Sequence, residues 1–165
     1  QTYAQGPSLG SSLTHWTVEA WLYHDATNMS PGSPCIVTEV YTGPPINFTV
    51  GNTTDSFPNL QVGSYNGGWA QTALGITLAS GNWYQVVGTW DGINIALYIN
   101  GVVASSLGIG GFTSASGGQG IRLMRRWDAD QYWGGLLSIV RIYSVDIGSA
   151  GVQQNYNATK ARFGL

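Results

Sequence analysis

The residues that could perform chemistry are few and far apart. Glycoside hydrolysis needs two carboxylates about 5–10 Å apart, one as the acid and one as the nucleophile or base. The chain has two glutamates, Glu19 and Glu39, and neither has another carboxylate within four residues. Asp128 and Asp130 are two residues apart, but they fall in the glycine-flanked segment WDADQYWGG, which is typical of a loop. The sequence therefore predicts no catalytic residue.

The sequence gives equally little support for a metal site or a reactive thiol. His15, His24 and Cys35 do not have the spacing of zinc ligands. Cys35 lies in the apolar segment CIVTEVY, which predicts a buried hydrophobic side chain rather than a reactive thiol. We therefore expect no zinc site.

Aromatic residues carry the main functional signal. Exposed Trp and Tyr offer a large, rigid contact area for a sugar ring or a protein partner. One group lies in alternating, strand-like segments, where we expect packing roles: Trp16, Trp21, Trp83 and Trp90. A second group lies in or beside loops rich in Gly and Asn, and its members are candidate ligand-binding residues: Tyr65, Trp69, Trp127, Tyr132 and Trp133. The alternative for this second group is a local lid over the core.

The composition limits the classes of partner. Charged residues make up 8% of the chain, against a usual value of about 25%. Six basic residues and a net charge of −2 exclude the electrostatic footprint of a nucleic-acid-binding protein. No apolar run approaches the roughly 18 residues of a membrane span. A surface of neutral polar groups is typical of an extracellular glycan-contacting module, or of a subunit that buries its surface in an assembly.

Short alternating runs separated by turn residues predict many strands and little helix. The strongest pattern is an antiparallel meander over Asn82–Ser105, turning at Asp91-Gly92 and Asn100-Gly101. A Gly/Ser-rich loop over Gly108–Gly120 follows. The pattern favours an all-β fold, a two-sheet antiparallel jelly-roll β-sandwich. The other expected strands are His15–Tyr23, Cys35–Tyr41, Ile46–Val50, Leu60–Tyr65, Gln71–Leu78, Ile121–Met124 and Leu136–Tyr143.

We expect one domain over residues 1–165, with an N-terminal arm at 1–13. A short helix is expected at 149–159, capped by Ser149, and a C-terminal tail at 160–165.

Three segments resemble laminin-G-like, concanavalin A-like jelly-roll domains. HWTVEAWLY resembles their opening strand, NWYQVVGTWDGINIALYINGVVAS their central meander, and YWGGLLSIVRIYSVDIGSAGVQQNYNATKARFGL their closing strand and helix. These segments cover roughly half the chain in the family's order. The resemblance implies that the first and last long strands are neighbours, which makes Glu19 and Arg141 a candidate structural ion pair.

The resemblance also bears on catalysis and metals. Hydrolases of this fold carry an E-x-D-x-E strand, which this chain lacks, so the resemblance implies a non-catalytic member. Pentraxin-like members bind calcium just before the closing strand, which makes Asp128, Asp130 and Gln131 candidate calcium ligands. The alternative is that these aspartates pair with Arg125 and Arg126. Other loop aspartates are weaker candidates: Asp25 and Asp55.

The end of the sequence adds an expectation about function. The ending NYNATKARFGL resembles those of such modules in phage and large-virus structural proteins. We therefore expect a surface-attachment module, a virion structural, decoration or fibre protein that self-associates and contacts glycans, with no required cofactor. The alternatives are a cellular extracellular lectin-like adhesion domain that uses calcium and, third, a glycoside hydrolase. A eukaryotic secretory pathway would add glycans at the N-x-S/T sites Asn28, Asn47, Asn52 and Asn157.

Overall fold

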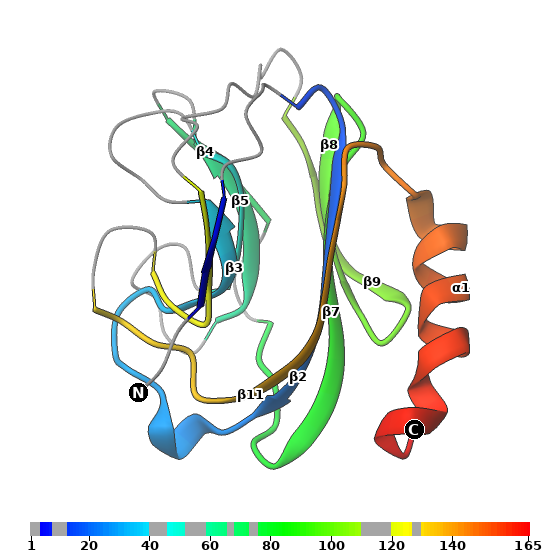
Figure 1. Cartoon of the computed structure of the whole chain (residues 1–165). Helices are drawn as coiled ribbons and strands as arrows, with labels where there is room; N and C mark the ends of the chain where they lie inside the picture. The colour runs from blue at the N-terminus through cyan, green and yellow to red at the C-terminus, as the bar shows by residue number, and fades with distance from the viewer. Residues whose placement is uncertain are drawn as a thin grey trace.

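Two antiparallel sheets face each other in the computed structural model, as Figure 1 shows. The structure describes residues 4–7, 13–39, 46–51, 59–65, 68–72, 76–109, 120–126 and 130–165. Most of the expected loop at Gly108–Gly120 lies outside these residues, as do Asn52, Trp127 and Asp128. The jelly-roll sandwich predicted from the strand pattern is confirmed.

The five-stranded sheet is built around the long alternating segment near the start of the chain. Its order is β11-β2-β7-β8-β9, so the first and last long strands are neighbours, as predicted. The meander turns where expected. Asp91 Oδ1 accepts hydrogen bonds from the backbone N–H groups of Ile93 and Asn94, and Asn100 and Gly101 both have positive φ, as a tight hairpin requires. The strands are β2 (Trp16–His24), β7 (Asn82–Trp90), β8 (Asn94–Ile99), β9 (Val102–Gly108) and β11 (Gly135–Tyr143).

The six-stranded sheet departs from two expectations. Its order is β1-β10-β3-β4-β5-β6. Residues 4–6, expected in an arm, instead form an edge strand because their backbone pairs with residues 121–123. The strand expected over Gln71–Leu78 ends at Gln71, because the Thr72 hydroxyl replaces a backbone partner and accepts from Val62 N at 3.1 Å. The strands are β1 (Ala4–Gly6), β3 (Cys35–Glu39), β4 (Ile46–Gly51), β5 (Gln61–Tyr65), β6 (Trp69–Gln71) and β10 (Ile121–Leu123).

The hydrophobic core fills the space between the two sheets. Alternate residues of β2 point inward, including Trp16, whose ring packs on Phe48 with centroids 5.7 Å apart. Trp16 and Trp90 are buried as predicted, and so is Cys35, whose Sγ lies 3.2 Å from Thr49 Oγ1.

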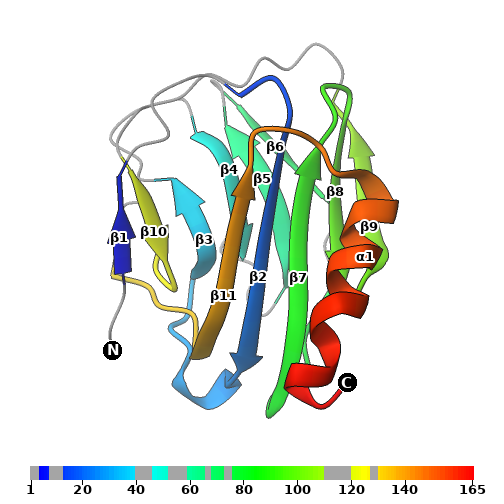
Figure 2. The ribbon, with the colours of Figure 1, turned by 45° about the vertical axis from the view of Figure 1, so that its right-hand side comes forward.

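Part of the outer face of the five-stranded sheet is covered by helix α1 (Gly148–Thr159) and the 3₁₀ turn η2 (Lys160–Phe163), and Figure 2 shows α1 on the side of β7, β8 and β9. Trp21 is fully buried there, stacked between Phe163 at 4.2 Å and Tyr156 at 5.9 Å. Residues 160–163, expected in a tail, therefore pack on the sheet. The helix begins at Gly148, whose N–H donates to Asp146 Oδ1. Ser149, expected as the cap, is exposed within the first turn.

A buried carboxylate joins the helix to this sheet. Glu19 and Arg141 lie directly opposite each other on β2 and β11, and Arg141 Nη1 donates to Glu19 Oε1 at 2.8 Å. Gln85 Nε2 donates to the same oxygen at 3.0 Å, and Asn155 Nδ2 on α1 donates to Oε2 at 2.8 Å. Glu19 is completely inaccessible to solvent, where Arg141 balances its charge and the two amides donate further hydrogen bonds to its oxygens.

None of the described helices is long and apolar enough to cross a membrane.

Candidate ligand-binding site

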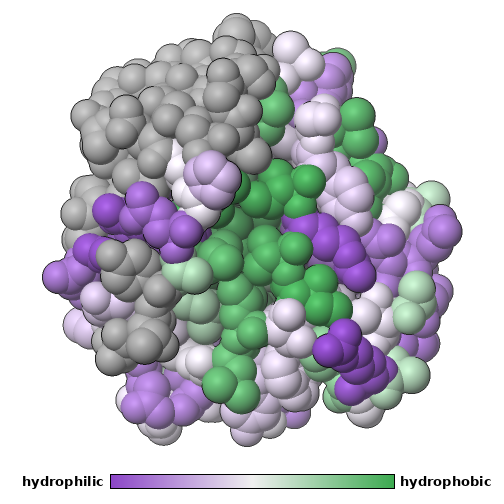
Figure 3. All heavy atoms as spheres, viewed as in Figure 1, coloured by the Kyte–Doolittle hydropathy of each residue, from purple (hydrophilic) through white to green (hydrophobic). Residues whose placement is uncertain are grey.

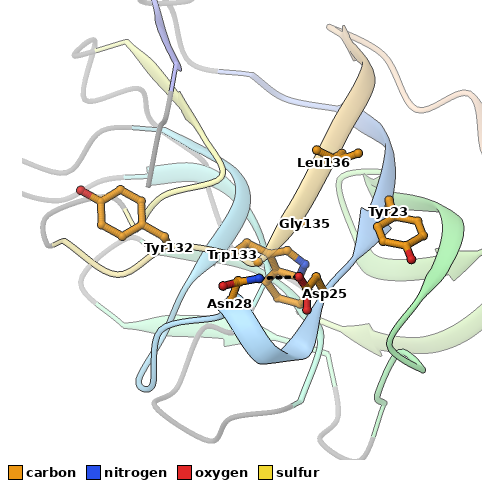
Figure 4. Close-up of a pocket in the computed structure, with 8 residues that line it drawn as sticks. Tyr23, Asp25, Asn28, Tyr132, Trp133, Gly135 and Leu136 are labelled. Carbon is orange, nitrogen blue, oxygen red and sulfur yellow. Dashed lines mark hydrogen bonds between the residues drawn. The ribbon is translucent and has the colours of Figure 1, made fainter.

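A pocket of about 350 Å³ opens at the end of the sandwich where β2 leaves its sheet and β11 enters it. Its volume falls within the range of small-molecule sites, roughly 300–1,000 Å³. Figure 4 shows Asp25, Asn28 and Trp133 together, with Tyr132 on one side and Tyr23 and Leu136 on the other. The pocket is lined by Tyr23, Asp25, Asn28, Tyr132, Trp133, Gly134, Gly135 and Leu136.

Asp25 supplies a fixed hydrogen-bond acceptor. It caps the 3₁₀ turn η1 (Ala26–Asn28), where its Oδ1 accepts from the backbone N of Thr27 at 3.0 Å and from the Thr27 hydroxyl at 2.6 Å. Asn28 Nδ2 donates to Oδ2 at 2.6 Å. The hydrogen bonds from Thr27, followed by that from Asn28, hold the pKa of the Asp25 carboxyl below its ordinary value. The carboxylate is therefore ionised and held in one orientation at neutral pH.

Two consecutive glycines allow the two walls of the pocket to meet. Asp25 N donates to Gly134 O at 3.0 Å, and Ser30 N donates to Tyr132 O at 2.9 Å. A Cβ atom at Gly134 would lie 2.1 Å from Asp25 O, and one at Gly135 would lie 1.8 Å from Tyr23 O. Gly135 also has φ +125°, a conformation that side chains disfavour. The backbone of β2 and the start of β11 can approach this closely only without side chains at 134 and 135.

Two of the predicted aromatic residues line the pocket. Trp133 is 4% exposed and forms part of its inner wall. Tyr132 is half-buried, its hydroxyl donates to Asp130 Oδ1 at 3.3 Å, and the Arg125 guanidinium lies 5.9 Å from its ring centre. These contacts hold the Tyr132 ring at the rim.

The other predicted aromatic residues are Tyr65, Trp69 and Trp127. Tyr65 and Trp69 are direct partners on β5 and β6, in the other sheet. Trp127 is outside the described residues. The sequence did not assign Tyr23 and Asn28 to a ligand-binding site, and it identified Asp25 only as a weaker calcium candidate.

A buried histidine supports the pocket from behind. The His24 ring is 4% exposed and packs on Trp133 with centroids 5.5 Å apart. Burial lowers the pKa of His24 below its ordinary value, and the nearby Asp25 charge opposes this effect only in part. The imidazole is therefore neutral at pH 7 and serves as a packing surface for Trp133.

The described calcium candidates use their oxygens in hydrogen bonds within the chain. Asp130 forms an ion pair with Arg125, as the alternative interpretation anticipated. Gln131 Oε1 accepts from Ser33 N at 2.7 Å and from Arg126 Nη1 at 3.1 Å. In the part of the chain that the structure describes, no three His, Cys, Asp or Glu residues could jointly hold a metal ion. With Asp128 outside that part, the calcium site stays a prediction.

The N-x-S/T sites lie in different surroundings. Asn28 lines the pocket, and its Nδ2, the atom to which a glycan would be attached, donates to Asp25. Asn157 is exposed on α1. The side chain of Asn47 and all of Asn52 lie outside the described parts. Glycosylation at Asn28 would therefore obstruct the pocket, whereas glycosylation at Asn157 would leave it open.

Comparison with known proteins supports the fold. The family model of the concanavalin A-like lectin/glucanases superfamily (Laminin_G_3) matches residues 1–153. No curated protein sequence matches the chain.

Solved structures of the same fold share little sequence with this chain. Domain 4 of AbnA, an extracellular arabinanase from Geobacillus stearothermophilus solved with arabinotriose, is 19% identical with a TM-score of 0.76, over 93% of this chain and 72% of that one. A heptameric SAP-like pentraxin from Limulus polyphemus is 17% identical with a TM-score of 0.62, over 90% and 70%. The ligand-binding domain of botulinum neurotoxin serotype D, solved with N-acetylneuraminic acid, is 14% identical with a TM-score of 0.68, over 93% and 39%.

Proposed function

Because the chain belongs to the concanavalin A-like lectin/glucanase superfamily, we propose that it binds carbohydrate and that the pocket beside Asp25 takes a sugar ring. The observation that carries the proposal is the meeting of a fixed, ionised carboxylate with aromatic rings in one small pocket. A sugar presents hydroxyl groups along its rim, which need hydrogen-bond acceptors and donors, and an apolar face, which packs on aromatic rings. Asp25 and Asn28 supply the first kind of contact, and the ring of Tyr132 supplies the second.

The pocket favours neutral sugars. Asp25 is ionised, and among the described residues no Lys, Arg or His lines the pocket to balance a negative ligand. A carboxylated sugar would place a second negative charge beside Asp25, which is unfavourable. The arabinanase domain named above was solved with a neutral oligosaccharide, arabinotriose.

We propose that binding is not coupled to hydrolysis. Within the described part of the chain, Asp25 is the one carboxylate that lines the pocket, whereas hydrolysis of a glycosidic bond needs two. Glu19 is fully buried beneath α1 with both carboxylate oxygens engaged, so a substrate cannot reach it.

The setting we propose is the surface of a virion or fibre, with an extracellular adhesion protein as the alternative. The support is compositional: charged residues make up 8% of the chain, which suits a subunit packed among copies of itself. The mass of the native particle, measured by light scattering on source material, tests this setting. A large symmetric assembly is expected, and a free monomer would contradict it.

Substitutions in the pocket test the binding site. A glycan array is expected to identify neutral sugars, and titration calorimetry then measures their affinity. Asp25→Asn and Tyr132→Ala should each weaken binding about tenfold or more, because one removes a charged acceptor and the other an aromatic surface. Asn is itself a good cap residue, so Asp25→Asn should preserve the turn.

Asn157→Ala, an exposed change on α1, serves as the control and should leave affinity unchanged. An array without any bound sugar, or pocket variants that bind as tightly as the unmodified protein, would contradict the proposed function.

A further inference from the structure

A second cavity borders the sugar pocket. Its volume is about 560 Å³, and it shares Trp133, Gly135 and Leu136 with the pocket. It runs along β11 towards the strands β1 and β10 of the opposite sheet. We call it the apolar groove. Its lining residues are Ala4, Leu123, Met124, Trp133, Gly135, Leu136, Leu137, Ser138 and Val140.

The strand order explains why the groove is open. β1 is the outermost strand of one sheet and β11 the outermost strand of the other. Figure 2 shows both on the same side of the sandwich. Core side chains such as Leu137 and Val140 therefore reach the surface between the sheets, and Leu136 is 62% exposed. Figure 3 shows this as a band of apolar surface in the middle of the face.

The chemistry of the groove differs from that of the pocket. Among the described residues that line it, none is charged and Ser138 is the only one with a polar side chain. Such a surface recognises hydrocarbon and offers few hydrogen bonds to further sugar hydroxyls. An oligosaccharide that continued into the groove would lose water from its hydroxyl groups without replacing those hydrogen bonds.

We infer that the ligand is a glycolipid, with its sugar headgroup in the pocket and its alkyl chain in the apolar groove. The inference rests on the proposed function, which it deepens. The shared border of the two cavities carries it, because Trp133 and Leu136 line both, so a chain attached to the bound sugar ring would have the groove beside it.

Alkyl glycosides provide the test. The probes are the methyl, butyl and hexyl glycosides of the sugar that binds best on the array, used below their micelle concentrations, with hexanol as the sugar-free probe. Each methylene that leaves water strengthens binding up to about fourfold, so the hexyl glycoside should bind at least about tenfold more tightly than the methyl glycoside.

Paired variants localise the effect. Leu136→Ser should remove most of the gain from chain length, measured as the ratio of hexyl to methyl glycoside affinity. This ratio is the readout because Leu136 borders the pocket as well as the groove. Ile93→Ser is the matched control, because Ile93 is 63% exposed, against 62% for Leu136, and lies in the turn between β7 and β8. The Ile93→Ser protein should retain the full gain in affinity with alkyl-chain length.

Four results would contradict the inference, and each would overturn a different part of it. Equal affinity for methyl and hexyl glycosides would overturn the glycolipid and leave carbohydrate binding standing. Hexanol binding as tightly as the hexyl glycoside would overturn the link between the two cavities. Dimers that Leu136→Ser dissociates would assign the groove to a second copy of the chain. No binding of any sugar would overturn the proposed function and this inference together.

Discussion

Replacing Glu19 with alanine is expected to lower the free energy of unfolding by about 3–5 kcal/mol. The substitution removes the acceptor for Arg141, Gln85 and Asn155 at once. Gln85 is fully buried, so its amide would be left without this partner in a place that water does not reach. Urea unfolding followed by tryptophan fluorescence and circular dichroism measures the change. Trp21, buried on the same face under Phe163, should report the loosening of η2.

An ion pair with an exposed carboxylate provides the control. Arg125 and Asp130 also form an ion pair, but the Asp130 side chain is 75% exposed. Asp130→Ala should therefore change stability by less than about 1 kcal/mol. The loss of stability in Glu19→Gln should fall between those in Glu19→Ala and Asp130→Ala, because the amide oxygen still accepts a hydrogen bond but carries no charge. A Glu19→Ala protein as stable as Asp130→Ala would show that the buried network contributes nothing net.

Replacing Gly135 with alanine is expected to cost about 3 kcal/mol or more and to abolish sugar binding. The new Cβ would lie 1.8 Å from Tyr23 O, a backbone atom that cannot move without shifting β2. The residue would also keep a φ of +125°, which adds strain. Thermal unfolding measures the stability loss, and titration with the array sugar measures the loss of binding.

Gly68→Ala is the control for the glycine substitution. No heavy atom lies within 4 Å of a Cβ at Gly68, so stability should change by less than about 1 kcal/mol. Gly134→Ala, with its Cβ 2.1 Å from Asp25 O, should behave like Gly135→Ala. A Gly135→Ala protein that retains both its stability and its sugar affinity would show that the pocket walls need not meet so closely.

Most of the fold could be predicted from local patterns. The meander was predictable because Asp91-Gly92 and Asn100-Gly101 encode their turns within a few residues. β1 was not, because the three residues AQG carry no alternation and form a strand only by pairing with residues 121–123. The packing of Phe163 on Trp21 was missed for the same reason, since it joins the two ends of the chain.

The candidate site was predictable only in part. Tyr132 and Trp133 stood out as aromatic residues in a glycine-rich segment. Asp25 and Asn28 join them because Gly134 brings β11 against the end of β2. That approach depends on a backbone contact between residues more than 100 positions apart, and no spacing or composition along the chain encodes it. The apolar groove depends likewise on which strands end up at the edges of their sheets.

Two side chains that bind Glu19 of β2 lie far along the sequence, which affects when this part of the protein can fold. Glu19 is synthesised early, but its partners Arg141 and Asn155 follow 122 and 136 residues later. At about 5–20 residues per second, a ribosome needs roughly 6–27 s to supply them. During that interval a growing chain carries the Glu19 carboxylate and the Trp21 ring without their cover. β11 forms one edge of the five-stranded sheet, so this sheet can be completed only after the segment that carries Arg141 has been synthesised.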